Sequence, residues 1–147
     1  MIVSTADLVN YRGQVTMVDG GFDPLHQGHV AYLEAAAGLG LPVLCNVSSD
    51  EYVARKHQPF LDQAERGAIL DAIRFVDYTH LSQIATEGVL RLLQPRNYAK
   101  GADWRGRLPE EELAVCSDSG IEVVYLDTVL DSSTAILERY EARRHRR

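Results

Sequence analysis

The chain has 147 residues and is 46% hydrophobic, so it is large enough to bury one hydrophobic core and too small for two domains. Its 15 basic and 21 acidic residues give a formal net charge of −6, which argues against a nucleic acid or an anionic membrane as a partner. Cys45 and Cys116 show no CxxC spacing, and no apolar run approaches the roughly 20 residues of a membrane span. We therefore expect one soluble, cytoplasmic domain over residues 1–147.

Short apolar segments alternate along the chain with segments of helical periodicity, and turn residues separate them. In chain order, the predicted elements are a short helix at Thr5–Asn10, a strand at Val15–Asp19, a helix at Gly28–Leu39, a strand at Leu41–Ser48, a helix at Gln63–Phe75, a strand at Asp77–Leu81, a helix at Ile84–Leu93, a strand at Arg96–Lys100, a helix at Pro109–Ser119, a strand at Ile121–Leu126 and a closing helix from Thr134.

Apolar strands that are joined by helices of this length predict a parallel sheet with helices on both faces. We predict a Rossmann-like three-layer α/β/α sandwich, in which five parallel strands follow the order 3-2-1-4-5 and the first strand is central. Ligands bind such sheets at the carboxyl ends of the strands. The basic end at residues 142–147 is expected to be a solvated, flexible tail.

The segment GGFDPLHQGH follows the first predicted strand and leads into a predicted helix. Gly20 and Gly21 permit a tight turn close to a ligand, and His26 and His29 flank the helix start, where backbone N–H groups favour an anion. Neither a Walker loop nor a G-x-G-x-x-G fingerprint is present. Two ring N–H donors at this place can hold phosphate oxygens during phosphoryl transfer. The competing interpretation is an ordinary helix cap beside a core histidine.

This segment resembles the G-x-F-D-x-x-H-x-G-H signature of the cytidylyltransferase-like nucleotidyltransferases. Four further segments resemble the family in the same order: NVSSDEYVARK at 46–56, QAERGAILDAIRFVD at 63–77, KGADW at 100–104 and EVVYLDTVLDSSTAI at 122–136. The resemblance covers nearly the whole chain. It implies an enzyme that transfers a nucleotidyl group from a nucleoside triphosphate to a small phosphorylated molecule and releases pyrophosphate, and it implies a homodimer.

The resemblance assigns catalytic roles to His26, His29 and Lys56. It implies nucleotide contacts for a larger set, which comprises Gly20, Gly21, Phe22, Asp23, Gly28, Arg66, Lys100, Gly101, Asp103, Trp104, Ser132, Ser133 and Thr134. Blander interpretations are a solvated loop charge for Lys56, a helix-surface ion pair for Arg66, a core residue for Trp104 and simple helix caps for the three hydroxyl residues. Mg²⁺ is the expected cofactor, bridging triphosphate oxygens, and no residue is assigned as its ligand.

Departures from the family pattern bear on the substrates. The segment DTVLD at 127–131 lacks the arginine that precedes the hydroxyl cluster in glycerol-phosphate cytidylyltransferases, and KGADW is similar to the KGGDY-type loop of heptose 1-phosphate adenylyltransferase domains. We therefore favour ATP as the donor and a sugar phosphate such as heptose 1-phosphate as the acceptor. Because Trp104 and the segment DAIRFVD are nearer to the cytidylyltransferases, the alternative is CTP with glycerol 3-phosphate or a similar polyol phosphate.

Other members and other classes of function fit the residues less well. Pantetheine-phosphate adenylyltransferases carry an Arg-Gly-Leu-Arg loop that is absent here, and the chain is short for a nicotinate-mononucleotide adenylyltransferase. A regulatory module that binds nucleotides without turnover would not need His26, His29 and Lys56 together. A subunit that serves only assembly is a further alternative.

Overall fold

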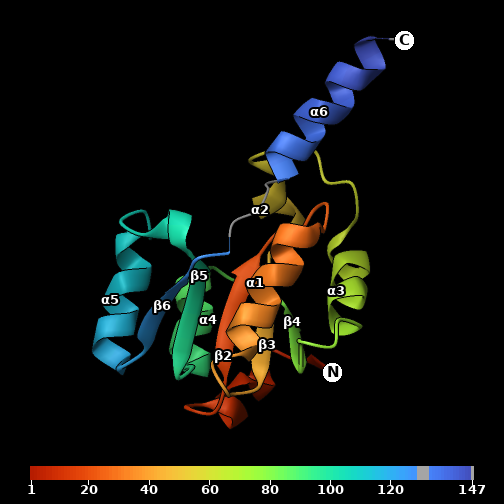
Figure 1. Cartoon of the computed structure of the whole chain (residues 1–147). Coiled ribbons are helices and arrows are strands. Elements are labelled where there is room, and N and C mark those ends of the chain that lie inside the picture. Colours follow the sequence, from red (N-terminus) through yellow and green to blue (C-terminus); the bar gives the residue numbers. More distant parts are fainter. Residues whose placement is uncertain (129–132, 147) are drawn as a thin grey trace.

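The computed structural model describes residues 1–128 and 133–146. These residues form a six-stranded parallel sheet with helices on both faces (Figure 1). The strands are β1 (Ile2–Val3), β2 (Thr16–Gly20), β3 (Val43–Val47), β4 (Tyr78–Leu81), β5 (Asn97–Gly101) and β6 (Glu122–Leu126). The α-helices are α1 (Gln27–Ala37), α2 (Asp50–Ala54), α3 (Gln63–Asp71), α4 (Thr86–Leu93), α5 (Glu110–Ser119) and α6 (Ser133–His145), and two 3₁₀ helices are η1 (Ala6–Tyr11) and η2 (Ala102–Trp104).

The strand order is β1-β4-β3-β2-β5-β6. The five predicted strands are therefore present in their predicted order, and β2 lies inside the sheet between β3 and β5. The prediction of five strands was wrong by one, because β1 adds an edge strand in which Ile2 pairs with Thr79 and Val3 with His80. Two residues are too few to show the alternation by which a strand is recognised.

Several helix boundaries also differ from the predictions. The predicted opening α-helix is the 3₁₀ helix η1, and the short helix α2 was missed because five residues give no helical periodicity. The helix that was expected to run to Phe75 ends at Asp71. Of the basic end, which was expected to be a flexible tail, residues 142–145 belong to α6, and the side chains of residues 142–146 are exposed.

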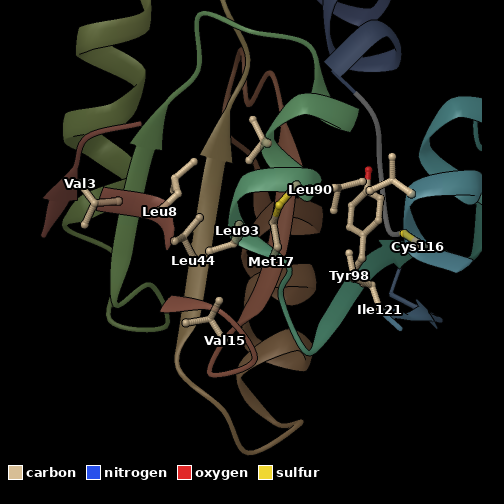
Figure 2. Close-up of a cluster of buried hydrophobic side chains, with 12 residues drawn as sticks. Val3, Leu8, Val15, Met17, Leu44, Leu90, Leu93, Tyr98, Cys116 and Ile121 are labelled. Carbon is tan, nitrogen blue, oxygen red and sulfur yellow. The ribbon is translucent and has the colours of Figure 1, made fainter. Parts of the chain in front are cut away.

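Two hydrophobic clusters lie on the two faces of the sheet, and successive residues of one strand contribute to opposite clusters. Met17 belongs to the cluster packed against η1, α4 and α5, whereas Val18 belongs to the cluster packed against α1 and α3. Figure 2 shows the first cluster, with Leu8, Leu90 and Cys116 packed around the strands. Burial of both faces explains why the strands are nearly continuous apolar runs.

The parallel arrangement sets the position of the functional residues. Since the strands all point the same way, their carboxyl ends meet at one edge of the sheet, and the helices that follow them begin there. None of the helices within residues 1–128 and 133–146 has the length and the apolar character that crossing a bilayer requires.

Candidate active site

A cavity of about 320 Å³ opens at the carboxyl ends of β2, β3 and β5. Its wall contains all of the predicted site residues in the described part of the chain except Arg66, namely Gly20, Gly21, Phe22, Asp23, His26, Gly28, His29, Lys56, Lys100, Gly101, Asp103, Trp104, Ser133 and Thr134. Ser132, which was predicted with them, lies outside the described residues. The fold thus brings together residues from both ends of the chain, and we call this space the first cavity.

The side chains of His26 and His29 both cap the start of helix α1. The His26 ring accepts a hydrogen bond at Nδ1 from the backbone N–H of Gly28 (3.1 Å), and the His29 ring accepts one at Nδ1 from the backbone N–H of His26 (3.3 Å). The two rings are stacked with centroids 3.8 Å apart, and Phe22 packs edge-on against His29 at 5.0 Å. Both interpretations from the sequence are therefore compatible, since the histidines cap a helix and also line the first cavity.

The capping bonds determine which ring nitrogen carries the proton. Because Nδ1 of each ring accepts a backbone N–H, the proton of the neutral imidazole is on Nε2. Burial, together with the neighbouring His26, lowers the pKa of His29 to about 3. His29 is therefore neutral at pH 7, and its one ring N–H is on Nε2.

Two lysines and one tryptophan form another part of the wall. The buried Lys100 Nζ lies 2.8 Å from Asp19 Oδ1 and 4.2 Å from the centroid of the Trp104 ring. Lys56 is exposed, and its Nζ lies 6.0 Å from the same ring centroid. Trp104 thus attracts both ammonium groups through its π face. It belongs to neither of the two hydrophobic clusters.

Sequence reasoning missed a polar network on the floor of the first cavity. Asp19 accepts hydrogen bonds from Lys100 and, at 3.3 Å, from the hydroxyl groups of Thr86 and Tyr98. The Tyr98 hydroxyl also lies 2.6 Å from Glu112 Oε1. Burial raises the pKa of Glu112 above its usual value, against the opposing effect of its bond to Tyr98. The one sign of this network in the sequence is the carboxylate of Asp19 at the end of an apolar predicted strand.

Asp23 lies in the loop between β2 and α1, which we call the signature loop, and its side chain stabilises this loop. Its buried carboxylate accepts the backbone N–H groups of Phe60 (2.8 Å) and Leu61 (3.3 Å). These bonds connect the loop before α1 to the loop before α3. The Asp23 carboxylate is thus already bonded to backbone N–H groups, although Asp23 also contributes to the cavity wall.

Arg66 lies outside the wall of the first cavity, although it was predicted to contact the nucleotide. Its side chain is buried and donates to three backbone carbonyl groups, those of Gly21 (2.8 Å), Ser48 (2.9 Å) and Leu61 (3.1 Å). It also forms an ion pair of 2.7 Å with Asp50. Arg66 is not an exposed helix-surface residue either. Through these bonds, Arg66 stabilises three loops that surround the first cavity.

The start of α6 closes one side of the first cavity. The Ser133 hydroxyl donates to the carbonyl oxygen of Pro24 (3.2 Å), which places this helix start beside the signature loop. Ser133 and Thr134 both contribute to the wall. Within residues 1–128 and 133–146, no three or more His, Cys, Asp or Glu side chains are grouped so that they could hold a metal ion.

Comparisons with known proteins agree with this geometry. Residues 17–139 match the model of the family described as cytidylyltransferase-like. The bifunctional protein HldE of a Nitratiruptor species is 33% identical over 138 residues, which cover 90% of this chain and 29% of the relative. HldE of Campylobacter concisus is 32% identical over 140 residues, with 90% and 29% covered. The chain thus spans about 29% of the length of these relatives.

A solved structure is also similar. It is the lipopolysaccharide core biosynthesis protein from Thermoplasma volcanium GSS1, with a TM-score of 0.67 and 25% sequence identity, and the match covers 78% of this chain and 96% of that chain. The family match spans most of the chain and includes the paired histidines of the first cavity. The chain therefore belongs to the cytidylyltransferase-like family of nucleotidyltransferases.

Proposed function

We propose that this chain transfers the adenylyl group of ATP to a sugar phosphate such as heptose 1-phosphate and releases pyrophosphate. The observation that carries the proposal is the pair of neutral imidazoles at the start of α1, which line a cavity that also contains Lys56 and Lys100. Donors fixed in this way can stabilise charge on a phosphoryl group that is being transferred.

The reaction is a direct displacement at the α-phosphorus. An oxygen of the acceptor phosphate forms the new P–O bond, and the bond to the β-phosphate breaks, so that pyrophosphate leaves with the electron pair. The acceptor phosphate is already anionic at neutral pH, and for this reason no general base is needed. The first cavity contributes positioning and charge stabilisation, through Nε2–H of His26 and His29 and through the ammonium group of Lys56 at its mouth.

The residues of the first cavity fit Mg²⁺ that is held chiefly by the nucleotide. Of the four carboxylates in its wall, Asp23 is bonded to backbone N–H groups and Asp19 is paired with Lys100. Glu112 Oε1 lies 2.6 Å from the Tyr98 hydroxyl, whereas Asp103 is exposed. This donor set would suit an ion that takes mostly phosphate and water ligands, and Asp103 would be the residue available to its bound water. When bound, Mg²⁺ would neutralise triphosphate charge and assist the departure of pyrophosphate.

Several observations favour the sugar phosphate as acceptor. The loop KGADW is similar to that of heptose 1-phosphate adenylyltransferase domains, and the solved relative from Thermoplasma volcanium is named for lipopolysaccharide core biosynthesis. CTP with glycerol 3-phosphate remains the second candidate, because the family is described as cytidylyltransferase-like and Trp104 resembles its cytidylyltransferase members. A cytoplasmic homodimer belongs to the same proposal.

Pyrophosphate release tests the proposal directly. The purified chain is assayed with ATP or CTP, each with heptose 1-phosphate or glycerol 3-phosphate, and with Mg²⁺ present or removed by chelation. We expect the fastest release with ATP and heptose 1-phosphate in the presence of Mg²⁺, and a sugar-nucleotide product by mass spectrometry. Faster turnover with CTP than with ATP on the same acceptor would refute ATP as the preferred donor. Pyrophosphate release that does not require any acceptor would refute the transfer reaction.

A further inference from the structure

A second cavity, of about 490 Å³, adjoins the first at the carboxyl edge of the sheet. The two cavities share wall residues, which are Ser48, Tyr52, Thr86, Pro109 and Glu112. Because α2, α4 and α5 all begin at this edge, their first turns surround the second cavity. A substrate bound there would be next to a nucleotide bound in the first cavity.

The charges around the second cavity disfavour a polyphosphate. Its wall contains the carboxylates of Glu51, Glu87 and Glu112, and Arg55 is the one basic residue that the described part of the chain contributes to it. The first cavity contains four carboxylates as well, but it also contains three histidines and two lysines. Two of its carboxylates, Asp19 and Asp23, already accept hydrogen bonds from Lys100 and from backbone N–H groups, respectively. The triphosphate therefore belongs in the first cavity, and the second suits a ligand with little negative charge.

The wall of the second cavity contains both hydrogen-bond donors and acceptors. Helix α4 has Ala85 at its N-cap, which carries no side-chain oxygen, so the first backbone N–H groups of this helix are available to a ligand. The amide of Gln83 and the guanidinium of Arg55 are further donors, and the carboxylates are acceptors. A hydroxyl group both donates and accepts, so a polyhydroxylated ligand matches this wall better than an apolar one.

Thr86 and Glu112 lie where the two cavities meet, and both are tied to the polar network. Thr86 Oγ1 donates to Asp19 Oδ2, and Glu112 Oε1 is held by the Tyr98 hydroxyl. Their positions are thereby fixed before any substrate binds, which lowers the entropy lost on binding. These two side chains can contact the part of an acceptor that is next to its reacting phosphate.

We propose that the second cavity is the acceptor subsite for a polyhydroxylated sugar or polyol phosphate, and that Thr86 and Glu112 bind its hydroxyl groups. This inference rests on the proposed nucleotidyl transfer. The hydroxylated part of the acceptor occupies the second cavity, and its phosphate reaches the triphosphate in the first.

Two substitutions test the inference, Thr86→Val, which removes the hydroxyl at nearly constant volume, and Glu112→Gln, which removes the charge. Steady-state kinetics with ATP and heptose 1-phosphate should show an acceptor KM that rises about threefold to tenfold for Thr86→Val and about tenfold or more for Glu112→Gln. KM for the nucleotide should change less than threefold. Thr86→Ser should restore the acceptor KM. Glu111→Gln, an exposed neighbour in the same helix turn, is the matched control and should behave like the parent.

Binding measurements separate the failure of this inference from the failure of the proposed function. Isothermal titration calorimetry with heptose 1-phosphate and a non-hydrolysable ATP analogue needs no turnover. A parent chain that turns over, with variants that raise the nucleotide KM instead or match the Glu111→Gln control, would overturn the acceptor subsite alone. A parent chain that binds heptose 1-phosphate without turnover, and loses this binding in both variants, would support the subsite and contradict the proposed function. Absence of binding to the parent would overturn both.

Discussion

Helices α1 and α3 begin with the same pattern of reciprocal hydrogen bonds but use different side chains for it. In α3, Asp62 accepts the N–H of Glu65 (2.9 Å), and Glu65 accepts the N–H of Asp62 (3.0 Å). In α1, the imidazoles of His26 and His29 accept the two corresponding hydrogen bonds. The carboxylate pair is exposed and lies outside the cavity walls, whereas the imidazole pair lines the first cavity.

Under the proposed function, the same local structure serves stability at the start of α3 and chemistry at the start of α1. Carboxylates suit the positive end of a helix dipole, and Asp is among the strongest N-cap residues. At α1 the same carboxylates would place negative charge where the proposed function places a triphosphate. A neutral imidazole caps the helix with Nδ1 and still has an N–H donor on Nε2, so it performs both tasks without this repulsion.

The largest expected effect comes from removing the imidazoles at α1. His26→Ala or His29→Ala should lower kcat by about 10²–10³, a loss of roughly 3–4 kcal/mol by analogy with a deleted oxyanion donor, because the lost N–H stabilises charge in the transition state. Lysine at either position should not restore activity, since a flexible ammonium cannot reproduce the ring geometry. Steady-state kinetics on folded variants is the measurement. A tenfold rise in nucleotide KM with kcat within threefold of the parent would mean that the rings only bind substrate.

The second prediction concerns Arg66, through which α3 holds the loops around the first cavity. Arg66→Leu should lower the free energy of unfolding by about 2–4 kcal/mol, because it leaves the carbonyl groups of Gly21, Ser48 and Leu61 without their donor. Urea unfolding measures this loss. Arg91→Leu, at an exposed position in the last turn of α4, is the control and should change stability by no more than about 0.5 kcal/mol. Equal losses in the two variants would contradict the structural role of Arg66.

The sequence predicted features that depend on local periodicity and on a contiguous motif. Alternating strands and helices were enough for the parallel sheet and for the order of five strands, and GGFDPLHQGH located the turn and the two histidines. Features that depend on distant pairing could not be predicted from the chain alone. Asp19, Tyr98 and Glu112 meet only because β2, β5 and α5 are neighbours. The nucleotide contact of Arg66 was implied by the family resemblance, and its backbone partners are not visible in a sequence.

The third prediction uses pH to compare the imidazole cap with a cap that does not titrate. The pKa of His29 is about 3 in the folded chain and near 6.5 in the unfolded chain, so the unfolded chain binds more protons between these values. The stability that depends on the neutral ring is thus complete above about pH 6.5 and is lost as the pH falls towards 3, by at most about 1.4 kcal/mol per pH unit.

The variant His29→Asn isolates this contribution, since the amide oxygen can accept the same N–H without titrating. Urea unfolding at pH 7.5, 6.5, 5.5 and 4.5 should show a steeper decline for the parent than for the variant. His80, whose pKa burial also lowers, contributes equally to both chains and cancels in the difference. Parallel declines would show that the pKa of His29 is the same in the folded and unfolded chains, and would contradict the lowered value.

The smallest effect is expected at the carboxylate cap of α3. Asp62→Ala removes the acceptor for the Glu65 N–H and should lower the free energy of unfolding by about 1 kcal/mol, the usual cost of losing an N-cap. Because Asp62 is exposed and lies in neither cavity wall, kcat and both KM values should stay within twofold of the parent once folding is confirmed.

Replacing His26 with Asn completes the comparison, since it keeps a good N-cap but removes the Nε2–H donor. His26→Asn should therefore match the parent in stability and match His26→Ala in kcat. If His26→Asn instead retained the parent's kcat, the catalytic contribution of this position would be the cap itself, and α1 and α3 would differ only in location.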